Sequence, residues 1–364
     1  MANSIINKGK LRRVNFYEDF MRSEGIPILR GFFVDDLMGV GLAPWKRKGG
    51  LGAYIDLEGA GGATGAYLCE IPPGGTLNPQ RFMIEEMIYI LRGKGATAVW
   101  QDGKPKRTFE WSVGSHFAIP LNAWHEHFNG QGEEPVRFLA VTNAPVVLNL
   151  FHDLDFVFNN PYVFSSRFHG EENYFSGNGR EYPGRIWESN FISDVQTFRV
   201  LDQVNRGGRS RNMHFELSDG AMASHVSEFP VGTYKKAHRH GAGFQIVILS
   251  GRGYTLLWKE GEKRTRVDWQ AGSLFVPPQM WFHQHFNIGE SPARYLAFHW
   301  SPHKYEFIKA LHTEGQAKNV KEGGNQIEYE NEDPEIHGLY EHELDRSGVR
   351  CKMKAMVSRC TGAE

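Results

Sequence analysis

The segment His283-Gln-His-Phe-Asn287 repeats, with one change, the segment His125-Glu-His-Phe-Asn129 that lies 158 positions earlier. At the same offset, Glu70–Asn129 aligns with Glu228–Asn287 without a gap, and 21 of the 60 aligned positions are identical. Such an alignment indicates an internal duplication, because unrelated segments rarely keep one register over this length. The sequence therefore predicts two tandem domains of one fold.

Each copy contains short apolar segments that end at turn residues. Met87–Leu91 and Gln245–Leu249 are rich in aliphatic residues and stop at Gly-x-Gly turns, after which Ala96–Trp100 and Tyr254–Trp258 follow. Short strands at regular spacing, separated by glycine-rich turns, are typical of a β-sandwich or β-barrel. We therefore predict an all-β protein.

The composition excludes several classes of protein. The chain has 364 residues, enough for two domains of about 100–150 residues. Its 41 basic and 42 acidic residues give a net charge of -1, which does not favour nucleic acid or a membrane as partner. Three cysteines without a CxxC pair, and an N-terminus without an apolar signal segment, lead us to expect a cytoplasmic protein.

The predicted domain boundaries follow the two copies. Helical spacing of apolar residues occurs outside the copies, at Tyr17–Met21 and Lys304–His312, and predicts short helical extensions. The tail from Glu314 onward is strongly charged, so we expect it to be exposed or bound to a partner. The boundaries are an N-terminal arm (1–50), a first domain (51–150), a connection (151–210), a second domain (211–302) and a C-terminal helix with a charged tail (303–364).

Three histidines of the second copy form a candidate metal site. His238 and His240 lie two residues apart on a predicted strand, so their side chains point to the same face. His283 follows 43 residues after His240, on a separate predicted strand. Three imidazoles suit iron, manganese, nickel, copper or zinc. We therefore expect His238, His240 and His283 to bind a metal ion.

The spacing of these residues resembles a known family. Gly232-(five residues)-His238-x-His240 and Gly272-(five)-Pro278-(four)-His283-(three)-Asn287 resemble the two cupin motifs. Since both copies carry the pattern, the chain is similar to a bicupin. The resemblance implies two tandem cupin barrels, each a double-stranded β-helix or jelly roll, with short helical extensions.

The resemblance includes an important difference at Phe244. A cupin usually has a glutamate ligand seven residues before the glycine that closes the strand, and here Phe244 occupies that place. A histidine set without a carboxylate is similar to the gentisate and salicylate type of ring-cleaving dioxygenase. Those enzymes bind the metal in their first cupin, whereas the first copy here has Gln80 and Phe82 at the positions of His238 and His240. We therefore expect the metal in the second cupin.

The resemblance and the donor set together lead to a predicted activity. Three neutral imidazoles leave a divalent ion its full charge and open positions, which favours a chelating anionic substrate and dioxygen. We expect a non-haem Fe(II) dioxygenase, an oxidoreductase of aromatic catabolism that cleaves a carbon–carbon bond of a small hydroxy-aromatic acid or enolate. The alternatives are a manganese, nickel or zinc lyase, decarboxylase or isomerase of a small carboxylic acid, and a non-catalytic bicupin that binds a small molecule.

Other residues of the second copy are candidates for the pocket or for contacts behind the metal ligands. The resemblance to bicupins, which can assemble through their sheet edges, leads us to expect a homo-oligomer. For His285 we favour a contact behind the ligands, because its counterpart His127 persists in the first copy. The alternation of side chains along a strand places Gln245 on the face opposite Phe244, toward the other barrel or solvent. The full set is His285, Gln245, Phe244, Arg239, Trp281, His225 and His299.

Overall fold

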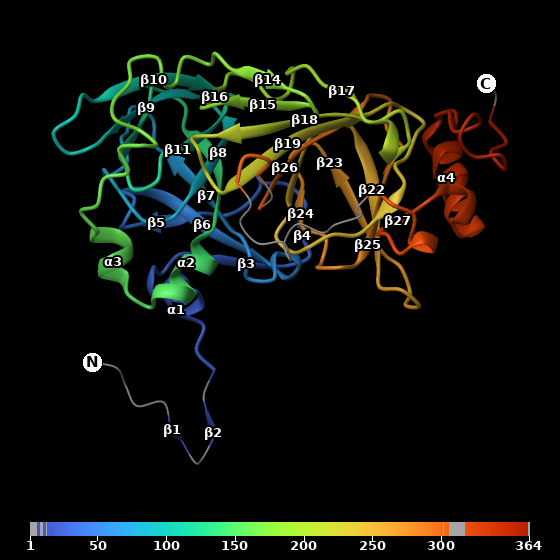
Figure 1. Ribbon diagram of the computed structural model, residues 1–364, viewed down its shortest axis with the longest axis horizontal. Helices are drawn as coiled ribbons and strands as arrows, with labels where there is room; N and C mark the ends of the chain where they lie inside the picture. Colours follow the sequence, from blue (N-terminus) through green and yellow to red (C-terminus); the bar gives the residue numbers. More distant parts are fainter. Residues whose placement is uncertain (1–5, 8–9, 12, 301, 306–316, 363–364) are drawn as a thin grey trace.

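The computed structural model describes residues 6–7, 10–11, 13–300, 302–305 and 317–362. Two β-barrels lie side by side along the long axis of the molecule, with α1, α2 and α3 beside the first barrel and α4 beside the second (Figure 1). The all-β prediction is confirmed. Among the described residues, no helix has the length and apolar character needed to cross a membrane.

Each barrel consists of a large sheet and a smaller one. In the first barrel the large sheet has the order β16-β11-β8-β13-β7-β6-β3, with β5 beside β6, and the small sheet has the order β10-β9-β12. The first-barrel strands from the N-terminal half are β3 (Ile28–Gly31), β5 (Ala43–Trp45), β6 (Gly50–Leu57), β7 (Gly65–Ile71), β8 (Glu86–Arg92), β9 (Lys94–Trp100), β10 (Arg107–Ser112), β11 (His116–Ile119), β12 (Trp124–Asn129) and β13 (Val136–Thr142).

The second barrel repeats this plan. Its large sheet has the order β14-β15-β18-β19-β26-β21-β24-β4, with β17 beside β18, and its small sheet has the order β23-β22-β25-β20-β27. The strands of this half are β14 (Arg180–Tyr182), β15 (Ile186–Ser189), β16 (Phe191–Ile192), β17 (Leu201–Asp202), β18 (Arg211–Leu217), β19 (Met222–Phe229), β20 (Ala237–His238), β21 (Gln245–Ser250), β22 (Arg252–Trp258), β23 (Thr265–Gln270), β24 (Leu274–Phe275), β25 (Phe282–Asn287), β26 (Ala293–Trp300) and β27 (Gln326–Ile327).

The remaining elements are short. In the part of the chain that the structure describes, an N-terminal hairpin and four α-helices lie outside the sheets, and the helix predicted around Tyr17–Met21 is present as α1. They are β1 (Ile6–Asn7), β2 (Lys10–Leu11), α1 (Phe16–Ser23), α2 (Ala144–Phe151), α3 (Leu154–Asn159) and α4 (Pro334–Ser347). The helix predicted over Lys304–His312 falls mostly outside the described residues.

The two barrels exchange short strands. β4 (Phe33–Val34) belongs to the N-terminal half but pairs with β24 of the second barrel, whereas β16 pairs with β11 of the first. Equivalent hydrogen bonds lie beside the two strand pairings: Ser273 Oγ donates to Asp35 O (2.6 Å), and Ser115 Oγ donates to Ser193 O (2.8 Å). The segments predicted as an arm (1–50) and a connection (151–210) therefore each supply strands to both barrels.

A repeated glycine–tryptophan contact explains part of the sequence duplication. A Cβ atom on Gly95 would lie 2.0 Å from Phe128 O and 2.5 Å from the Trp111 ring. On Gly253 it would lie at the same two distances from Phe286 O and the Trp269 ring. Only glycine allows this close approach in either barrel, so both identities follow from packing.

The barrels share one apolar interface. Side chains of the first barrel, among them Leu68 and Leu139, form a single buried cluster with Phe215 and Phe298 of the second barrel. Within this interface, His116 Nε2 lies 2.8 Å from Ser224 Oγ. Burial of apolar surface contributes about 25 cal/mol per Å². The shared cluster therefore stabilises the two barrels as one folded unit.

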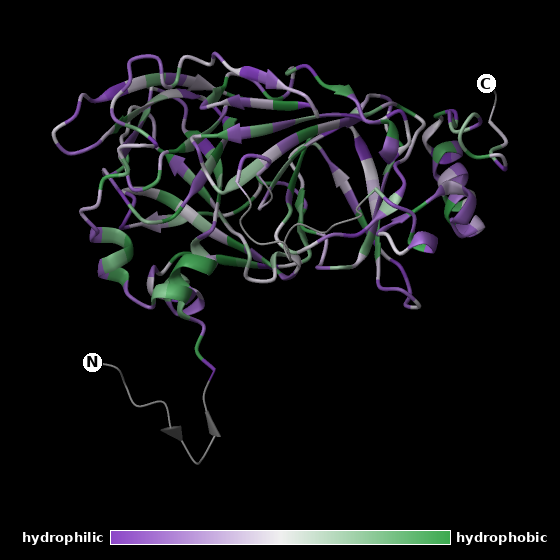
Figure 2. Ribbon diagram, viewed as in Figure 1, coloured by the Kyte–Doolittle hydropathy of each residue, from purple (hydrophilic) through white to green (hydrophobic). Residues whose placement is uncertain are grey.

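The C-terminal segment differs from the prediction of an exposed charged tail. Figure 2 shows that α4 has a mixed surface, with hydrophobic and hydrophilic residues alternating along it. The apolar residues pack on the second barrel: Tyr340 and Leu344 are buried in one cluster with Tyr234 and Phe286. Glu335 and Asp345 are exposed, whereas Glu343 is buried beside Leu344, and the sequence composition alone did not separate these faces.

Candidate metal centre

His238, His240 and His283 converge inside the second barrel, as the sequence predicts. His238 lies on β20 and pairs directly with His283 of β25, while His240 follows just after β20. All three side chains are buried, and one ring nitrogen from each lies within 4.8 Å of those of the other two. The closest pair is His238 Nε2 and His283 Nε2, at 3.1 Å.

The hydrogen bonds of the other ring nitrogens define the donor atoms. The Nδ1 atoms face backbone carbonyls: Lys236 O for His238 (3.3 Å), Gly241 O for His240 (2.9 Å) and Trp281 O for His283 (3.3 Å). A carbonyl only accepts, so each Nδ1 carries the proton and each Nε2 presents a lone pair.

The electrostatics of this cluster fit a cation. Burial lowers the pKa of His240 to about 3 and holds the pKa of His238 and of His283 well below the ordinary value. All three imidazoles are therefore neutral at pH 7. Two lone pairs 3.1 Å apart repel one another unless a cation lies between them, so the donor set fits a divalent transition metal.

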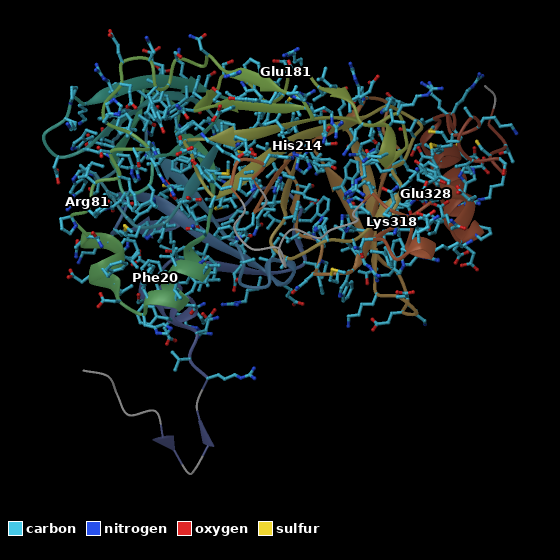
Figure 3. The ribbon with its side chains drawn as sticks, viewed as in Figure 1. Phe20, Arg81, Glu181, His214, Lys318 and Glu328 are labelled. Atoms are coloured by element: carbon cyan, nitrogen blue, oxygen red, sulfur yellow. The ribbon has the colours of Figure 1, made fainter. Side chains whose placement is uncertain are left out.

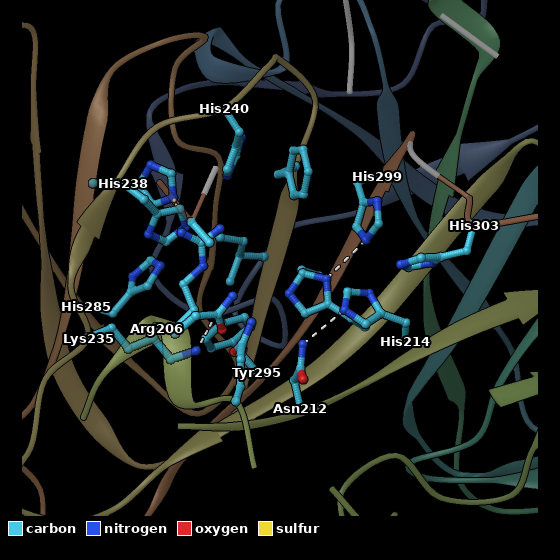
Figure 4. Close-up of a pocket in the computed structure, with 18 residues that line it drawn as sticks. Arg206, Asn212, His214, Lys235, His238, His240, His285, Tyr295, His299 and His303 are labelled. Carbon is cyan, nitrogen blue, oxygen red and sulfur yellow. Dashed lines mark hydrogen bonds between the residues drawn. The ribbon is translucent and has the colours of Figure 1, made fainter. Parts of the chain in front are cut away.

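The three histidines line a cavity of about 230 Å³ that extends beyond them. Phe244 lies between His240 and His299, with ring centroids 3.8 Å and 4.6 Å away. Beyond Phe244, His299 Nε2 lies 3.1 Å from His225 Nδ1, and His214 faces His225 across the β18–β19 pair. Figure 4 shows His238, His240 and His285 on one side of the cavity and His214, His299 and His303 on the other, and Figure 3 labels His214 near the centre of the view.

Two buried cations line the same cavity. Lys235 Nζ donates hydrogen bonds to Ser227 Oγ (2.6 Å) and Tyr295 Oη (2.9 Å), and burial lowers its pKa. Arg206 Nη1 donates to Gln326 Oε1 (2.9 Å), and burial lowers the pKa of this guanidinium to about 10. The cavity therefore brings two cationic side chains close to the three imidazoles.

The other predicted site residues divide into two groups. His225, His299, Phe244 and His285 line the cavity. His285 Nδ1 lies 2.8 Å from Thr255 Oγ1, and His127 Nδ1 lies at the same distance from Thr97 Oγ1 in the first barrel. This repeated hydrogen bond explains why the histidine occurs in both copies.

Gln245, Arg239 and Trp281 lie outside the cavity. Gln245 Nε2 donates to Thr64 Oγ1 of the first barrel (3.2 Å), in agreement with the predicted contact between barrels. Arg239 Nη1 lies 3.2 Å from a carboxylate oxygen of Glu260, and its guanidinium lies over the Phe282 ring. Trp281 is partly buried against the core of the second barrel.

The equivalent region of the first barrel contains a lysine. Lys48 Nζ lies 3.8 Å from Glu86 Oε1 and 3.1 Å from Gln80 Oε1, and both Lys48 and Glu86 are buried. His125 Nε2 lies 3.8 Å from Glu86 Oε2. The ammonium group thus supplies the positive charge beside the carboxylate in this barrel.

Lys235, Arg206, Tyr295 and His214 also line the cavity but were not among the predicted site residues. A sequence signal was available for two of them. The repeat offset of 158 places Arg206 on Lys48, and strand alternation places Tyr295 on the same face of β26 as His299. His214 requires knowledge of the β18–β19 pairing, and no sequence pattern identifies Lys235.

The chain is similar to solved structures of oxalate decarboxylases. That of Bacillus subtilis, at pH 4.6, is 14% identical with a TM-score of 0.50, covering 75% of this chain and 77% of that chain. That of Lactobacillus farciminis, in complex with formate, is 12% identical with a TM-score of 0.50, covering 74% and 86%. A structure on the substrate binding mode of oxalate decarboxylase is 14% identical with a TM-score of 0.51, covering 76% and 79%. No protein-family model and no curated protein matches the chain.

These similarities correct the predicted reaction. The prediction of a gentisate- or salicylate-type dioxygenase, an oxidoreductase, is wrong, because the similar structures are decarboxylases, which are lyases. The preference for iron and the assignment to aromatic catabolism depended on the dioxygenase prediction and are not supported. The error has a physical cause: the histidine pattern identifies metal donors but not the buried cations Lys235 and Arg206. At this level of identity the similarity establishes the architecture, and the chain has the fold of a bicupin.

Proposed function

We propose that the protein is a metal-dependent lyase that decarboxylates a small carboxylic acid in the cavity of the second barrel. The observation that carries this proposal is the combination, in one cavity, of three convergent neutral imidazoles with the buried cations Lys235 and Arg206. The decarboxylases among the solved structures of this fold support the same class of reaction.

The charge of the cavity favours an anionic substrate. Removing Lys235 from water disfavours its charged form, and its described hydrogen bonds go to two neutral hydroxyls. A carboxylate substrate would place a negative charge beside this ammonium. The cavity volume of about 230 Å³ lies below the range of about 300–1,000 Å³ typical of drug-sized ligands, which favours a substrate of a few heavy atoms.

His238, His240 and His283 would hold the metal ion through their Nε2 atoms. When bound, a divalent ion such as manganese, nickel or zinc acts as a Lewis acid that polarises a carboxylate and stabilises negative charge. Phe244 and Ile246 form an apolar wall of the cavity, which excludes water from the reacting group.

Decarboxylation also requires a proton. Loss of CO2 from a carboxylate leaves an electron pair on carbon, and a proton must reach that carbon to complete the product. Lys235 is the group to which we assign this role, because it lines the cavity and its ammonium is held by the hydroxyls of Ser227 and Tyr295. Burial lowers its pKa, which makes the ammonium a better acid at neutral pH.

The test is CO2 release by the reconstituted enzyme. The metal-free protein is reloaded with Mn²⁺, Ni²⁺ or Zn²⁺ and incubated with ¹³C-labelled oxalate, malonate and 2-oxo acids in D₂O. We expect labelled CO2 and one deuterium on the product carbon for one acid of this set. The variant His240→Ala serves as the metal-site control and should release none.

Absence of CO2 from every acid, together with no heat of binding for these acids, would contradict the proposal. If the acids bind but none reacts, the non-catalytic alternative replaces it.

A further inference from the structure

A second cluster of metal-binding side chains lies outside the barrel cavity, in the C-terminal segment. It consists of His337 and Glu341 on α4 and of Cys351 and Cys360 in the chain that follows. One donor atom from each of the four residues lies within 4.8 Å of the other three. Neither the sequence motifs nor the reaction proposed above uses any of these residues.

The fold brings the four residues together by local geometry. His337 and Glu341 are four positions apart, so α4 places them on one face. The helix ends at Ser347, and the following Gly348, with a φ of 69°, reverses the direction of the chain. A turn at Met353–Val357 then returns Cys360 to the side of Cys351.

The donor atoms of the histidine and the carboxylate are held in place by hydrogen bonds. Tyr234 Oη donates to Glu332 Oε1 (2.9 Å), so it accepts from His337 Nδ1 (3.1 Å), and the lone pair of this imidazole lies on Nε2. Glu341 Oε1 accepts from the backbone N–H (2.7 Å) and the hydroxyl (2.8 Å) of Thr361. Partners of this kind orient the ligands in metal sites.

His337 Nε2 and the two thiols are the strongest indication of a ligand. The Nε2 atom is buried, lies 3.3 Å from Glu341 Oε1 and forms no hydrogen bond. The sulfur atoms of Cys351 and Cys360 lie 3.1 Å apart and both residues are buried. A buried imidazole lone pair without a partner is costly, and a cation at this point would satisfy it.

We propose that His337, Glu341, Cys351 and Cys360 bind a zinc ion that stabilises the C-terminal segment. Two sulfurs, one nitrogen and one carboxylate oxygen form a four-donor set suited to tetrahedral Zn²⁺, and no position remains open for a substrate. On binding, Zn²⁺ replaces the two thiol protons, which are released to solvent. The site is structural and independent of the reaction proposed for the barrel.

The proposed zinc site connects the C-terminal segment to the barrel cavity. His337 contacts Tyr234, which precedes Lys235 in the chain. Glu332, the acceptor of the Tyr234 hydroxyl, also accepts from Gln284 Nε2 (2.6 Å), the residue after His283. Zinc binding should therefore stabilise the backbone from which two residues of the cavity project.

The test measures zinc in full-length protein that lacks the barrel metal site. In the His240→Ala background we expect about one zinc per chain, and about none after Cys351→Ser and Cys360→Ser are added. Cys69→Ser, which removes the buried cysteine of the first barrel, is the matched control and should retain the zinc. Calorimetry in buffers of different ionisation enthalpy should detect about two protons released per zinc.

Cobalt provides a second measurement, which needs no substitution in the C-terminal cluster. Co²⁺ added to the metal-free His240→Ala protein should give a thiolate-to-cobalt charge-transfer band, because only the C-terminal cluster combines sulfur donors with a histidine among the described residues. A zinc content unchanged by the double serine substitution would overturn the proposal. So would a Cys351–Cys360 disulfide in the intact mass, or a folded and reduced wild-type protein that binds no zinc.

Discussion

Replacing Lys235 by methionine should separate the stability of the protein from its activity. The ammonium is buried, has no described carboxylate partner in the cavity and contacts only the hydroxyls of Ser227 and Tyr295 among its described hydrogen bonds. Exchanging a buried charge for an apolar side chain of similar volume stabilises proteins by about 1–4 kcal/mol. The two hydroxyls lose a partner, at a cost of about 1 kcal/mol each.

These magnitudes separate folding from function. We expect the free energy of unfolding of Lys235→Met to change by between about -1 and +2 kcal/mol. A charge-assisted hydrogen bond to a substrate carboxylate contributes about 1.5–3 kcal/mol, so its loss weakens substrate binding by about 10- to 150-fold. Loss of proton delivery lowers kcat by a further factor of about 10²–10⁴.

The assay compares Lys235→Met with Lys236→Met. Lys236 forms an ion pair with Glu328 and does not line the cavity, so its removal should change kcat/KM by no more than about twofold. Urea denaturation gives the free energy of unfolding, and release of labelled CO2 gives kcat and KM. Equal kcat/KM values for the two variants, with unchanged carboxylate binding, would refute the role assigned to Lys235.

The other predictions concern the metal ligands, the first barrel and the interface between barrels. His240→Ala should abolish Mn²⁺ binding, measured by electron paramagnetic resonance, while the circular dichroism spectrum is retained, because the apolar cores hold the fold. Lys48→Met should lower the free energy of unfolding by about 3–5 kcal/mol, because it leaves Glu86 buried without its cation. Adding Glu86→Gln should restore most of the lost free energy. No recovery of stability in urea titrations would contradict the pairing of Lys48 with Glu86. Burial lowers the pKa of His116 to about 4, so the unfolded chain binds more protons than the folded protein between pH 6.5 and 4. His116 should therefore lower the free energy of unfolding by about 3 kcal/mol as the pH falls from 6.5 to 4. In urea titrations over this pH range, the free energy of unfolding of His116→Asn should depend less steeply on pH.

The sequence was sufficient for the features that follow a local or repeated pattern. The offset of 158 residues predicts two like barrels, and the two-residue spacing of His238 and His240 predicts that both imidazoles face one point. The cavity cations Lys235 and Arg206 lie in no local sequence pattern of this kind. Arg206 lies in a short 3-10 turn (Val204–Arg206), within a segment that has no apolar periodicity. Its approach to the histidines depends on contacts between distant parts of the chain.

Features built from very short elements were also beyond prediction. β4 and β16 have two residues each, too few for any hydrophobic period to be recognised. Cys351 and Cys360 are nine residues apart and match no common spacing of metal ligands. Their proximity depends on the turn between them and on the position of α4.

The exchange of β4 and β16 explains why the protein needs a first barrel that has Gln80 and Phe82 where the second has His238 and His240. The N-terminal half lays β4 along β24, a strand that ends eight residues before His283, and the C-terminal half returns β16 to the first barrel. Neither half can be removed without exposing an unpaired edge of its neighbour. A first barrel without these histidines still covers the edge of β24, whereas removal of the barrel would expose it. A chain cut in the segment between α3 and β14 should accordingly remain associated as two interlocked fragments, and each fragment alone should aggregate.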